Sequence, residues 1–575
     1  MEKIWNFKPT PATVEEQATV QTLEKELTVN QAMATMLWQR GIHSFDEAKH
    51  FFRPSLSDLH DPFLMKDMEI AVNRLLLAIE KNEKIVIFGD YDVDGTTAVA
   101  LFYGYLFEHY QNIAYYNPDR YKEGYGISTM GIDWAAAEGA TLMISLDCGI
   151  KSIDKIAYAK EKHGIEFIIC DHHEPGDELP DAVAVLDPKR TDCPYPFKEL
   201  TGNGVGFKLL TAFCLKKGIA LDGLFQYLDL AMVSIASDIV PIVGENRILA
   251  YHGLKKINEN PRIGLKALKQ VSGFMGEMTI ENVVFVLGPR INAAGRIKHA
   301  KAAVELLLSD NLEEAIEFAY AIQEHNTQRR ELDASITEQA LAMIQNDPWI
   351  FSEAKSTVLF NEGWHKGVIG IVASRCIENY YRPTVIFTLS KENEAAGSAR
   401  SVPGFDLYKA IEACSQHLIQ FGGHMHAAGM TIAVENIEAF RRAFDEQVVK
   451  NTNEEILTPK INVDLDLPIS EISPKFYRIL KQMAPFGPHN MQPVFVSKNL
   501  TLASDPRILK EKHLKLEILD ETTGAVLSAI GFGIAEKYYS GLKNGDNFSM
   551  AYSIEENTFR DKTTLQLFIR DIKFE

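Results

Sequence analysis

Cysteine and long apolar runs are scarce in this sequence. Its six cysteines, scattered among 575 residues without CxxC spacing, fit neither a disulfide framework nor a cysteine-based zinc site. No apolar run reaches the roughly 18 residues that a membrane-spanning helix needs. The first residues, MEKIWNFKPT, lack the apolar core of a secretory signal. We therefore expect a protein without membrane segments that works in the cytoplasm.

Positive charge is also in deficit, with 59 Lys and Arg against 78 Asp and Glu and a net charge of −19. Nucleic-acid binders are often basic, because phosphate contacts release counterions. The balance therefore argues against passive coating of nucleic acid, but it leaves a local basic groove open. A site that collects carboxylates to hold cations would itself make the protein acidic. The ordinary apolar content of 46% indicates a globular chain.

Short apolar strands that end in acidic residues recur along the first half of the chain. One covers residues 84–88 and leads into an acidic loop and a helix expected to begin near Thr96, and others end at Asp147, Asp171 and Asp187. Strands that alternate with helical stretches indicate a parallel sheet covered on both faces. Ligands bind at the carboxyl ends of such strands, where these acidic residues lie.

The length predicts roughly three to four domains, and the pattern beyond the sheet changes several times. Residues 300–346 have helical periodicity with almost no breakers, as one long helix or two. Five or six short alternating strands near the C-terminus predict a small β-barrel. The predicted segments are a helical preamble (1–64), a parallel-sheet domain (65–299), a connecting helix (300–346), a second α/β domain (347–450) and a barrel (455–575).

The segment GDYDVDG places Asp90, Asp92 and Asp94 two residues apart. Alternate residues of an extended segment face the same way, so these carboxylates can converge on a cation cluster. Carboxylates packed this closely repel one another unless cations neutralise them. A solvated acidic turn is the alternative. A calcium EF-hand is disfavoured, because the run follows a buried strand and lacks the required Glu six residues after the Gly.

A second group of metal-binding side chains is the run Asp171, His172 and His173 at another strand end. Asp147 in SLDCGI and Asp238 in IASDIVP complete the set. Carboxylates mixed with imidazole suit a pair of Mn²⁺ or Mg²⁺ ions, which promote displacement at phosphorus. No GxSxG elbow or Walker A loop is present, so hydrolysis by metal-activated water is favoured over covalent catalysis.

These motifs carry a family resemblance. The segments GDYDVDGTT, SLDCGI, DHH and IASDIVP together resemble the DHH phosphoesterase superfamily, and GPRINAAGRI, GSARSVPGFDL and GGHMHAAG narrow the resemblance to its RecJ family. The resemblance spans roughly residues 65–575. It implies an α/β multidomain protein with a DHH catalytic domain, a DHHA1 domain and a C-terminal OB-like β-barrel. The implied activity is 5′→3′ hydrolysis of single-stranded DNA to mononucleotides in recombination and repair, alongside a RecQ-type helicase and a single-strand-binding protein.

The resemblance also assigns residues by motif position. The implied metal ligands are Asp92, Asp94, Asp147, His172 and Asp238. Asp147 would bridge two ions, and His173 would lie close to the scissile phosphate as a ligand or a charge stabiliser. Many superfamily members have a His ligand where this chain has Phe88, so one ion should be held by fewer protein groups. Asp90 is interpreted as a residue that supports the ligands.

Basic and polar residues in the later motifs are candidates for DNA binding. Guanidinium groups and backbone donors suit phosphate, including a 5′-terminal phosphate. The candidates are Arg120, Ser398, Arg400 and His424 for phosphate, Arg290 and Arg296 for the strand backbone, and Lys510 and Lys512 in the barrel. Phe486 and Phe495 are candidates for stacking on bases. The alternative is that the arginines pair with acidic neighbours and that the Phe side chains belong to the core.

Two other functions fit part of the pattern. A DHH phosphoesterase for short oligonucleotides, pAp or cyclic dinucleotides would need only the two α/β domains, so the barrel argues against it, and the same argument applies to an inorganic pyrophosphatase. A catalytically silent DNA-binding or scaffold protein would be expected to have lost carboxylates or the His pair, which this chain retains.

Overall fold

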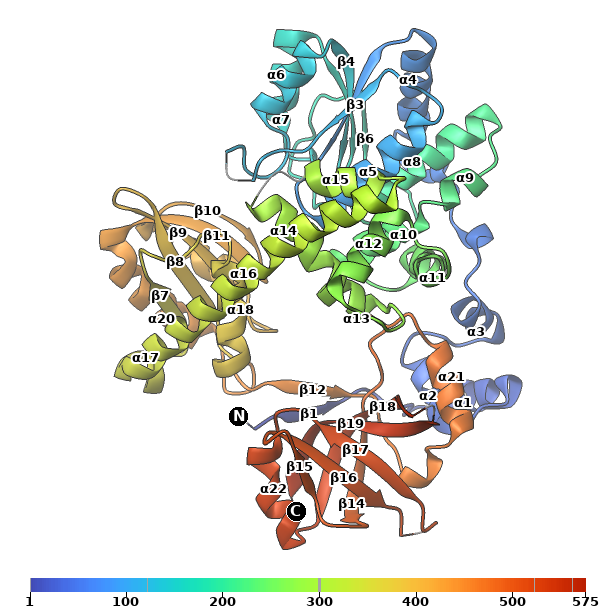
Figure 1. Cartoon of the computed structure of the whole chain (residues 1–575), viewed down its shortest axis with the longest axis vertical. Helices are drawn as coiled ribbons and strands as arrows, with labels where there is room; N and C mark the ends of the chain where they lie inside the picture. The colour runs from blue at the N-terminus through green and yellow to red at the C-terminus, as the bar shows by residue number, and fades with distance from the viewer. Residues whose placement is uncertain (1, 121, 298–300, 522, 561, 575) are drawn as a thin grey trace. The chain divides into compact units, whose positions relative to one another are not determined.

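The computed structural model describes residues 2–120, 122–297, 301–521, 523–560 and 562–574, without the side chains of 294–297 and 559 (Figure 1). The chain divides into two compact units, each taken in turn below. One comprises Met1–Phe7 and Thr327–Val463, and the other comprises Lys8–Asn326 and Asp464–Glu575. None of the helices in these described ranges is both long and apolar enough to span a membrane.

The larger unit contains the predicted parallel sheet. Its five strands lie in the order β3 (Ile113–Tyr116), β2 (Lys84–Gly89), β4 (Ala140–Leu146), β5 (Glu166–Cys170) and β6 (Ala184–Leu186), and all neighbours are parallel. The chain runs outward from β2 to β3 and then returns to the other side of β2, so the topology switches between β2 and β4. Ligands of open α/β sheets bind at such a switch point.

Helices cover both faces of this sheet, which explains why β2 is apolar at successive positions. Ile85 and Ile87 belong to one buried cluster, and Val86 and Phe88 belong to another on the opposite face. The first face is covered by α4 (Met68–Glu80), α5 (Val93–Phe107), α8 (Gly202–Lys217) and α10 (Leu228–Ser237), and the second by α6 (Thr129–Ala137) and α7 (Ile153–Tyr158).

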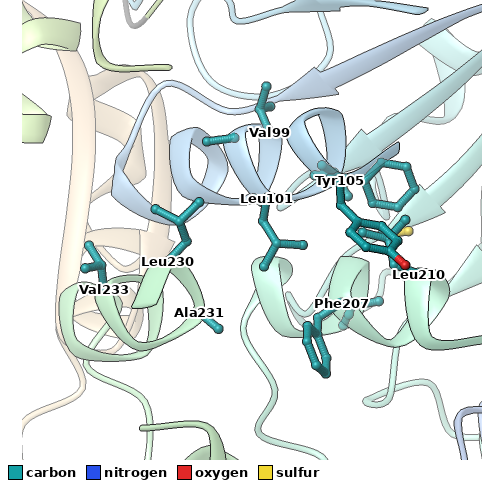
Figure 2. Close-up of a cluster of buried hydrophobic side chains, with 14 of the residues drawn as sticks. Val99, Leu101, Tyr105, Phe207, Leu210, Leu230, Ala231 and Val233 are labelled. Atoms are coloured by element: carbon teal, nitrogen blue, oxygen red, sulfur yellow. The ribbon is translucent and has the colours of Figure 1, made fainter. Parts of the chain in front are cut away.

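Helix α5 lies at the centre of the first face. Figure 2 shows Leu101 and Tyr105 pointing from α5 toward α8, where Phe207 and Leu210 lie, with Leu230 of α10 close by. Further helices follow in the order α9 (Asp222–Phe225), α11 (Gly244–Glu259), α12 (Ile263–Ser272), α13 (Ile280–Asn282), a π-helical turn (Val283–Leu287), α14 (Gly288–Ile297) and α15 (Lys301–Leu308). This packing fixes the helix ends that face the switch point.

The C-terminal sheet closes into a barrel. It has seven strands, and β14 pairs with β16 as well as β18, so β14, β18, β19, β17 and β16 form a ring. The bounds are β13 (Leu465–Asp466), β14 (Phe495–Leu502), β15 (Arg507–Leu509), β16 (His513–Leu519), β17 (Val526–Gly531), β18 (Phe548–Phe559) and β19 (Lys562–Phe574), with α21 (Pro474–Gln482) and α22 (Ala535–Asn544). A five-stranded barrel of this kind is the OB-like architecture that the sequence predicts.

The N-terminal helices pack against this barrel, which local sequence patterns did not predict. Helices α1 (Val14–Leu27), α2 (Gln31–Trp38) and α3 (Phe45–Phe52) contribute Leu23 and Leu37 to the same buried cluster as Phe495 and Tyr552. In the smaller unit, β1 (Ile4–Phe7) pairs in parallel with β12 (Lys460–Val463). Segments more than 400 residues apart in the chain are thus neighbours.

The smaller unit is the second α/β fold that the sequence predicts. Its sheet has the order β10 (Leu418–His424), β11 (Ala427–Ala433), β9 (Glu394–Arg400), β8 (Thr384–Lys391) and β7 (Thr357–Phe360). Its helices are α17 (Pro348–Ser352), α18 (Ile369–Tyr380), α19 (Leu407–Glu412) and α20 (Ile437–Asn451). Helix α16 (Leu312–Asn346) has 35 residues, and the division between the units falls within it.

One expectation about a helix end needs correction. The helix after β2 begins at Val93 rather than near Thr96, because Asp92 caps it by accepting a hydrogen bond from the amide of Gly95. The connecting region contains two helices, α15 and α16, separated by residues 309–311, which is one of the two arrangements that the sequence predicts.

We expect Leu101→Ala to lower the free energy of unfolding of the parallel-sheet region by about 2–5 kcal/mol, because it leaves a cavity in a dense core. Leu101 is 0% exposed, whereas Leu77 on α4 is 38% exposed. Urea unfolding followed by circular dichroism measures the change. Leu77→Ala serves as the control and should cost no more than about 0.5 kcal/mol. Equal losses in the two variants would contradict this account of the core.

Candidate metal centre and nucleic-acid interface

The loop after β2 presents three carboxylates at the switch point. Asp92 caps α5, and Asp94 lies in the first turn of that helix with 2% exposure. Asp90 is 1% exposed, and its Oδ1 accepts a hydrogen bond from the amide of Gly126 at 3.1 Å. Its buried Oδ2 has no hydrogen-bond partner among the described residues. An unsatisfied buried carboxylate oxygen is costly, so it points to a cation.

His172 joins this loop to the ends of β4 and α10. Its Nε2 lies 3.1 Å from Oδ1 of Asp147, and 3.7 Å from Oδ2 of both Asp94 and Asp238. Asp147 follows β4 in the left-handed region, at φ 61°, and Asp238 ends α10. One buried ring nitrogen therefore faces three carboxylates from three separate elements. This is the arrangement that a shared cation would require.

The donor atoms fall into three overlapping groups. In each group the ligand atoms all lie within 4.8 Å of one another, and the groups are Asp90–Asp92–Asp147, Asp94–His172–Asp238 and Asp147–His172–His173. Asp147 and His172 each belong to two groups. Carboxylate oxygens with imidazole nitrogen are suitable ligands for Mn²⁺ or Mg²⁺. The residues thus fit a pair of ions that share Asp147.

The pKa shifts of these residues also suit metal binding. Burial, together with the charge of neighbouring carboxylates, raises the pKa of Asp90, Asp94, Asp147 and Asp238. Burial also lowers the pKa of His172, which keeps its imidazole available as a neutral ligand. A cation placed among these carboxylates would offset their mutual repulsion and favour their charged forms.

His173 has a different environment from His172. Its Nδ1 lies 2.7 Å from Oδ1 of the buried Asp171, and its Nε2 lies 3.0 Å from the hydroxyl of Tyr125. Burial opposes the charged form, but the hydrogen bond with Asp171 raises the pKa of His173 to about 9. Burial would raise the pKa of Asp171, but His173 holds it below its usual range. His173 therefore carries a positive charge suited to a phosphate.

Phe88, at the position where related proteins are expected to have a His ligand, is packed in a hydrophobic cluster. It lies in the cluster on the opposite face of the sheet, stacked on Tyr116 with ring centroids 5.7 Å apart. Asp90, two residues later, turns into the centre instead. The spacing of the acidic loop made Asp90 one of three possible metal-binding carboxylates, and the family resemblance gave it a supporting role. Its group with Asp92 and Asp147 makes it a candidate ligand.

The arginines predicted in the larger unit differ in their surroundings. Arg120 lies over the ring of Tyr91, 4.9 Å from its centroid, close to the acidic loop. Arg290 is 7% exposed and donates from Nε to Oε1 of Gln323 at 2.8 Å and from Nη1 to the carbonyl of Val286 at 2.5 Å. These contacts give Arg290 a structural role, and its DNA contact stays a prediction. The side chain of Arg296 lies outside the described residues.

Three of the predicted phosphate contacts share one end of the sheet in the smaller unit. Arg400 on β9 is aligned with Ala427 on β11, which is aligned with His424 on β10. Nη1 of Arg400 lies 3.2 Å from Oγ of Ser398. A Cβ added at Gly370 would lie 2.8 Å from both Nη2 of Arg400 and Oγ of Ser398. Gly370 therefore lets these donors approach the start of α18, a combination that suits phosphate.

The barrel presents aromatic rings beside the predicted lysines. Lys510 and Lys512 are exposed in the hairpin that leads into β16, whose first residue is His513. The ring centroid of His513 lies 5.0 Å from that of Phe532, which lies 5.6 Å from that of Phe568. The guanidinium of Arg570 lies 4.4 Å from the centroid of Phe568. This set, His513, Phe532, Phe568 and Arg570, is called the aromatic face below.

The stacking role expected for Phe495 is wrong, because this side chain is 0% exposed in the barrel core. Phe486 is partly buried against the same core. The signal for the aromatic face was present in β19, where Phe568 and Arg570 alternate with the buried Leu567 and Ile569. This alternation identifies Phe568 as an outward-facing ring only when the structure shows which side of β19 faces the barrel core.

Three family models match the chain. One described as "DHH family, N-terminal domain" matches residues 84–235, one described as "DHHA1 domain" matches residues 350–450, and one described as "RecJ OB domain" matches residues 463–571. These ranges lie inside the predicted domains, and the α/β multidomain fold is confirmed. The exact domain boundaries stay predictions.

Curated proteins and solved structures agree with these models. The single-stranded-DNA-specific exonuclease RecJ of Bacillus subtilis is 36% identical over 559 residues, covering 97% of this chain and 70% of that protein. The exonuclease of the same name from Haemophilus influenzae is 34% identical over 530 residues, covering 90% of this chain and 92% of that protein.

Among solved structures, the crystal structure of RecJ in complex with Mn²⁺ from Thermus thermophilus has a TM-score of 0.83 at 26% identity, and the match covers 100% of this chain and 80% of that one. A structure of the same protein with Mg²⁺ has a TM-score of 0.77 at 25% identity, covering 100% of this chain and 78% of that one. The matches extend through the catalytic sheet, the second α/β fold and the barrel. The chain therefore belongs to the RecJ family, whose curated members are named single-stranded-DNA-specific exonucleases.

Proposed function

We propose that this protein is a single-stranded-DNA-specific exonuclease that works from the 5′ end, depends on two Mn²⁺ or Mg²⁺ ions and releases 5′-mononucleotides in recombination and repair. The observation that carries the proposal is the set of three overlapping ligand groups at the switch point, which share Asp147 and His172. The names of the curated relatives support the substrate. A protein kept only as a scaffold would have no reason to retain this acidic cluster.

The residues of the centre have different roles in the proposed hydrolysis of the phosphodiester. Asp90 and Asp92 form one ligand group with Asp147, and Asp94 and Asp238 form another with His172. These residues would hold a pair of divalent ions, which would supply an activated water and stabilise the charge that develops on the phosphate oxygens. His173, held in its charged form by Asp171, stabilises a phosphate oxygen beside this centre. The catalytic set is then Asp92, Asp94, Asp147, His172, His173 and Asp238, with Asp90 added as a ligand.

Two surfaces hold the strand. Ser398, Arg400 and His424 bind the 5′-terminal phosphate, because they gather guanidinium and hydroxyl donors at the uncapped start of α18. The aromatic face of the barrel, with Lys510 and Lys512, stacks on bases and binds the backbone of a longer strand. A substrate of one or two nucleotides would not need this second surface.

The cellular setting follows from the substrate. An enzyme restricted to single strands needs another protein to open a duplex, so we propose a RecQ-type helicase and a single-strand-binding protein as partners. The cytoplasm is the proposed location, since chromosomal DNA lies there in bacteria and all six cysteines are free thiols, as expected for a reducing compartment.

Digestion of a single-stranded oligonucleotide labelled at either end tests the function. With Mn²⁺ or Mg²⁺ the 5′ label should be released as mononucleotide, and EDTA should stop the reaction. A blunt duplex should stay intact until a RecQ-type helicase unwinds it. Asp147→Asn should lower kcat by at least about 1,000-fold, because the shared ligand contributes several kcal/mol.

The controls for this assay separate the alternatives. Asn tolerates the left-handed backbone of Asp147, so the variant should stay folded. Asp181→Ala removes a carboxylate whose side chain is 80% exposed and should leave kcat unchanged. Cleavage of a dinucleotide beside intact long strands would move the assignment to the small-substrate phosphoesterases. No cleavage of either substrate would sink the enzymatic proposal.

Arg400→Ala should raise KM for a 5′-phosphorylated strand by about 10- to 150-fold, because a hydrogen bond to a charged group contributes about 1.5–3 kcal/mol. The effect should shrink on a strand with a 5′-hydroxyl, which lacks the charged partner. Steady-state kinetics on both substrates measure it. Arg375→Ala, on α18 and paired with Glu378, is the control for charge alone. An equal rise in KM on both strands would contradict a role at the 5′ phosphate.

Phe532→Ala should weaken binding of a long single strand by about 1–3 kcal/mol, since it removes one stacking platform. Phe532 is 54% exposed, and Phe351, in the smaller unit, is 53% exposed. Phe351→Ala is therefore a matched control. Fluorescence anisotropy with a labelled strand, in EDTA so that no cleavage occurs, measures the affinity. The same loss in both variants would rule out a specific role for the aromatic face.

A further inference from the structure

The first turn of α8 contacts Asp94 directly. The amide of Gly202 donates to Oδ2 of Asp94 at 2.7 Å, and the amide of Asn203 donates to Oδ1 at 2.9 Å. Thr201 caps the helix by accepting a hydrogen bond from the amide of Gly204. The positive end of a helix dipole favours a carboxylate at this place. Both oxygens of one candidate ligand are thus oriented by backbone groups of a single helix turn.

Helix α10 adds a third contact to the same carboxylate. Oγ of Ser234 lies 2.7 Å from Oδ1 of Asp94 and 2.6 Å from Oγ1 of Thr201. Ser234 is 0% exposed, as are Thr201 and Asn203. Asp94 is 2% exposed and accepts hydrogen bonds from all three groups, so the orientation of its carboxylate is well defined. Its Oδ2 also lies 3.7 Å from Nε2 of His172.

The same turn is in close contact with the backbone of Asp147. A Cβ added at Gly202 would lie 2.5 Å from both Cα and Cβ of Asp147, and 2.8 Å from its amide nitrogen. Distances below 3.0 Å force a displacement, and here two of the atoms are backbone and the third is Cβ, which is not the far end of a flexible side chain. Asp147 has little room to yield, because its amide also donates to the carbonyl of Cys170 at 2.9 Å. Only the absence of a side chain at residue 202 permits this approach.

We propose that Gly202 is a positioning residue that sets the separation of Asp94 and Asp147, and through them the separation of the two metal ions. The amide of Gly202 donates a hydrogen bond to the carboxylate of Asp94, and its Cα packs against the backbone of Asp147. Asp94 belongs to the ligand group with His172 and Asp238, whereas Asp147 belongs both to the group with Asp90 and Asp92 and to the group with His172 and His173. The inference rests on the proposed function, because it assumes that these groups hold metal.

Gly202→Ala tests the inference, with Gly204→Ala as a matched control. Both changes add one methyl group to the first turn of α8. At Gly204 the nearest atoms to an added Cβ are side-chain atoms of Leu200 at 3.3 and 3.4 Å and Oγ1 of Thr201 at 3.5 Å. The control should therefore bind metal and cleave DNA as the unchanged protein does.

The readouts separate positioning from general damage. Electron paramagnetic resonance of the full-length protein loaded with Mn²⁺ should show the spin-coupled signal of a close pair of ions, and Gly202→Ala should weaken or abolish that coupling. Its kcat should fall by about 100-fold, the order expected for a displacement of about 1 Å at a reacting centre. KM for DNA should change by no more than a few-fold, because the contacts described for Gly202 are with the candidate metal ligands Asp94 and Asp147. A coupled signal and a kcat equal to those of the unchanged protein would overturn the inference.

Ser234→Ala decides the matter if circular dichroism shows that Gly202→Ala does not fold. The change removes one donor to Asp94 with little change in volume, and it should weaken Mn²⁺ binding, measured by calorimetry, by about 10- to 100-fold, as for other groups that orient a ligand. Unchanged affinity would overturn the inference. Failure of the proposed function would instead appear as absence of DNA cleavage by the unchanged protein.

Discussion

The repulsion between buried carboxylates is the constraint on which this structure depends. Asp90, Asp94 and Asp147 are each 1–2% exposed, and burial together with their neighbours raises the pKa of each. Such a cluster is stable only with cations and with donors that fix each oxygen. The start of α8, Ser234 and the amide of Gly126 supply those donors. The dense packing of α5 against α8 and α10 holds them in place.

Backbone strain is concentrated at the same centre. Asp147 has φ 61°, and Ile239, which directly follows Asp238, has φ 59° although it is β-branched. Such conformations cost on the order of 1–3 kcal/mol each and persist only where surrounding contacts enforce them. Both residues turn the chain immediately at a candidate ligand. The strain is therefore a consequence of bringing strand and helix ends to one point.

The surfaces proposed to bind DNA are formed by residues other than the candidate metal ligands. The smaller unit gathers Ser398, Arg400 and His424 across adjacent strands, and the barrel displays the rings of Phe532, directly after β17, and of Phe568 on β19. Neither surface requires a protein that is basic overall, because each uses only a few cationic side chains placed beside other hydrogen-bond donors or aromatic rings. This explains how a chain with a net charge of −19 can belong to a family of DNA exonucleases.

The sequence by itself determined the parallel sheet, the order of the folds and the residue types at the strand ends, because these depend on local periodicity and spacing. It also indicated Asp92, Asp94 and His172. Only the tertiary structure decided that Phe88 faces the opposite side of the sheet, that Asp90 turns inward, that Gly202 separates two ligands, and that Phe568 rather than Phe495 faces outward. Each of these depends on which side of an element meets the core and on contacts between distant segments, which packing fixes and local sequence does not.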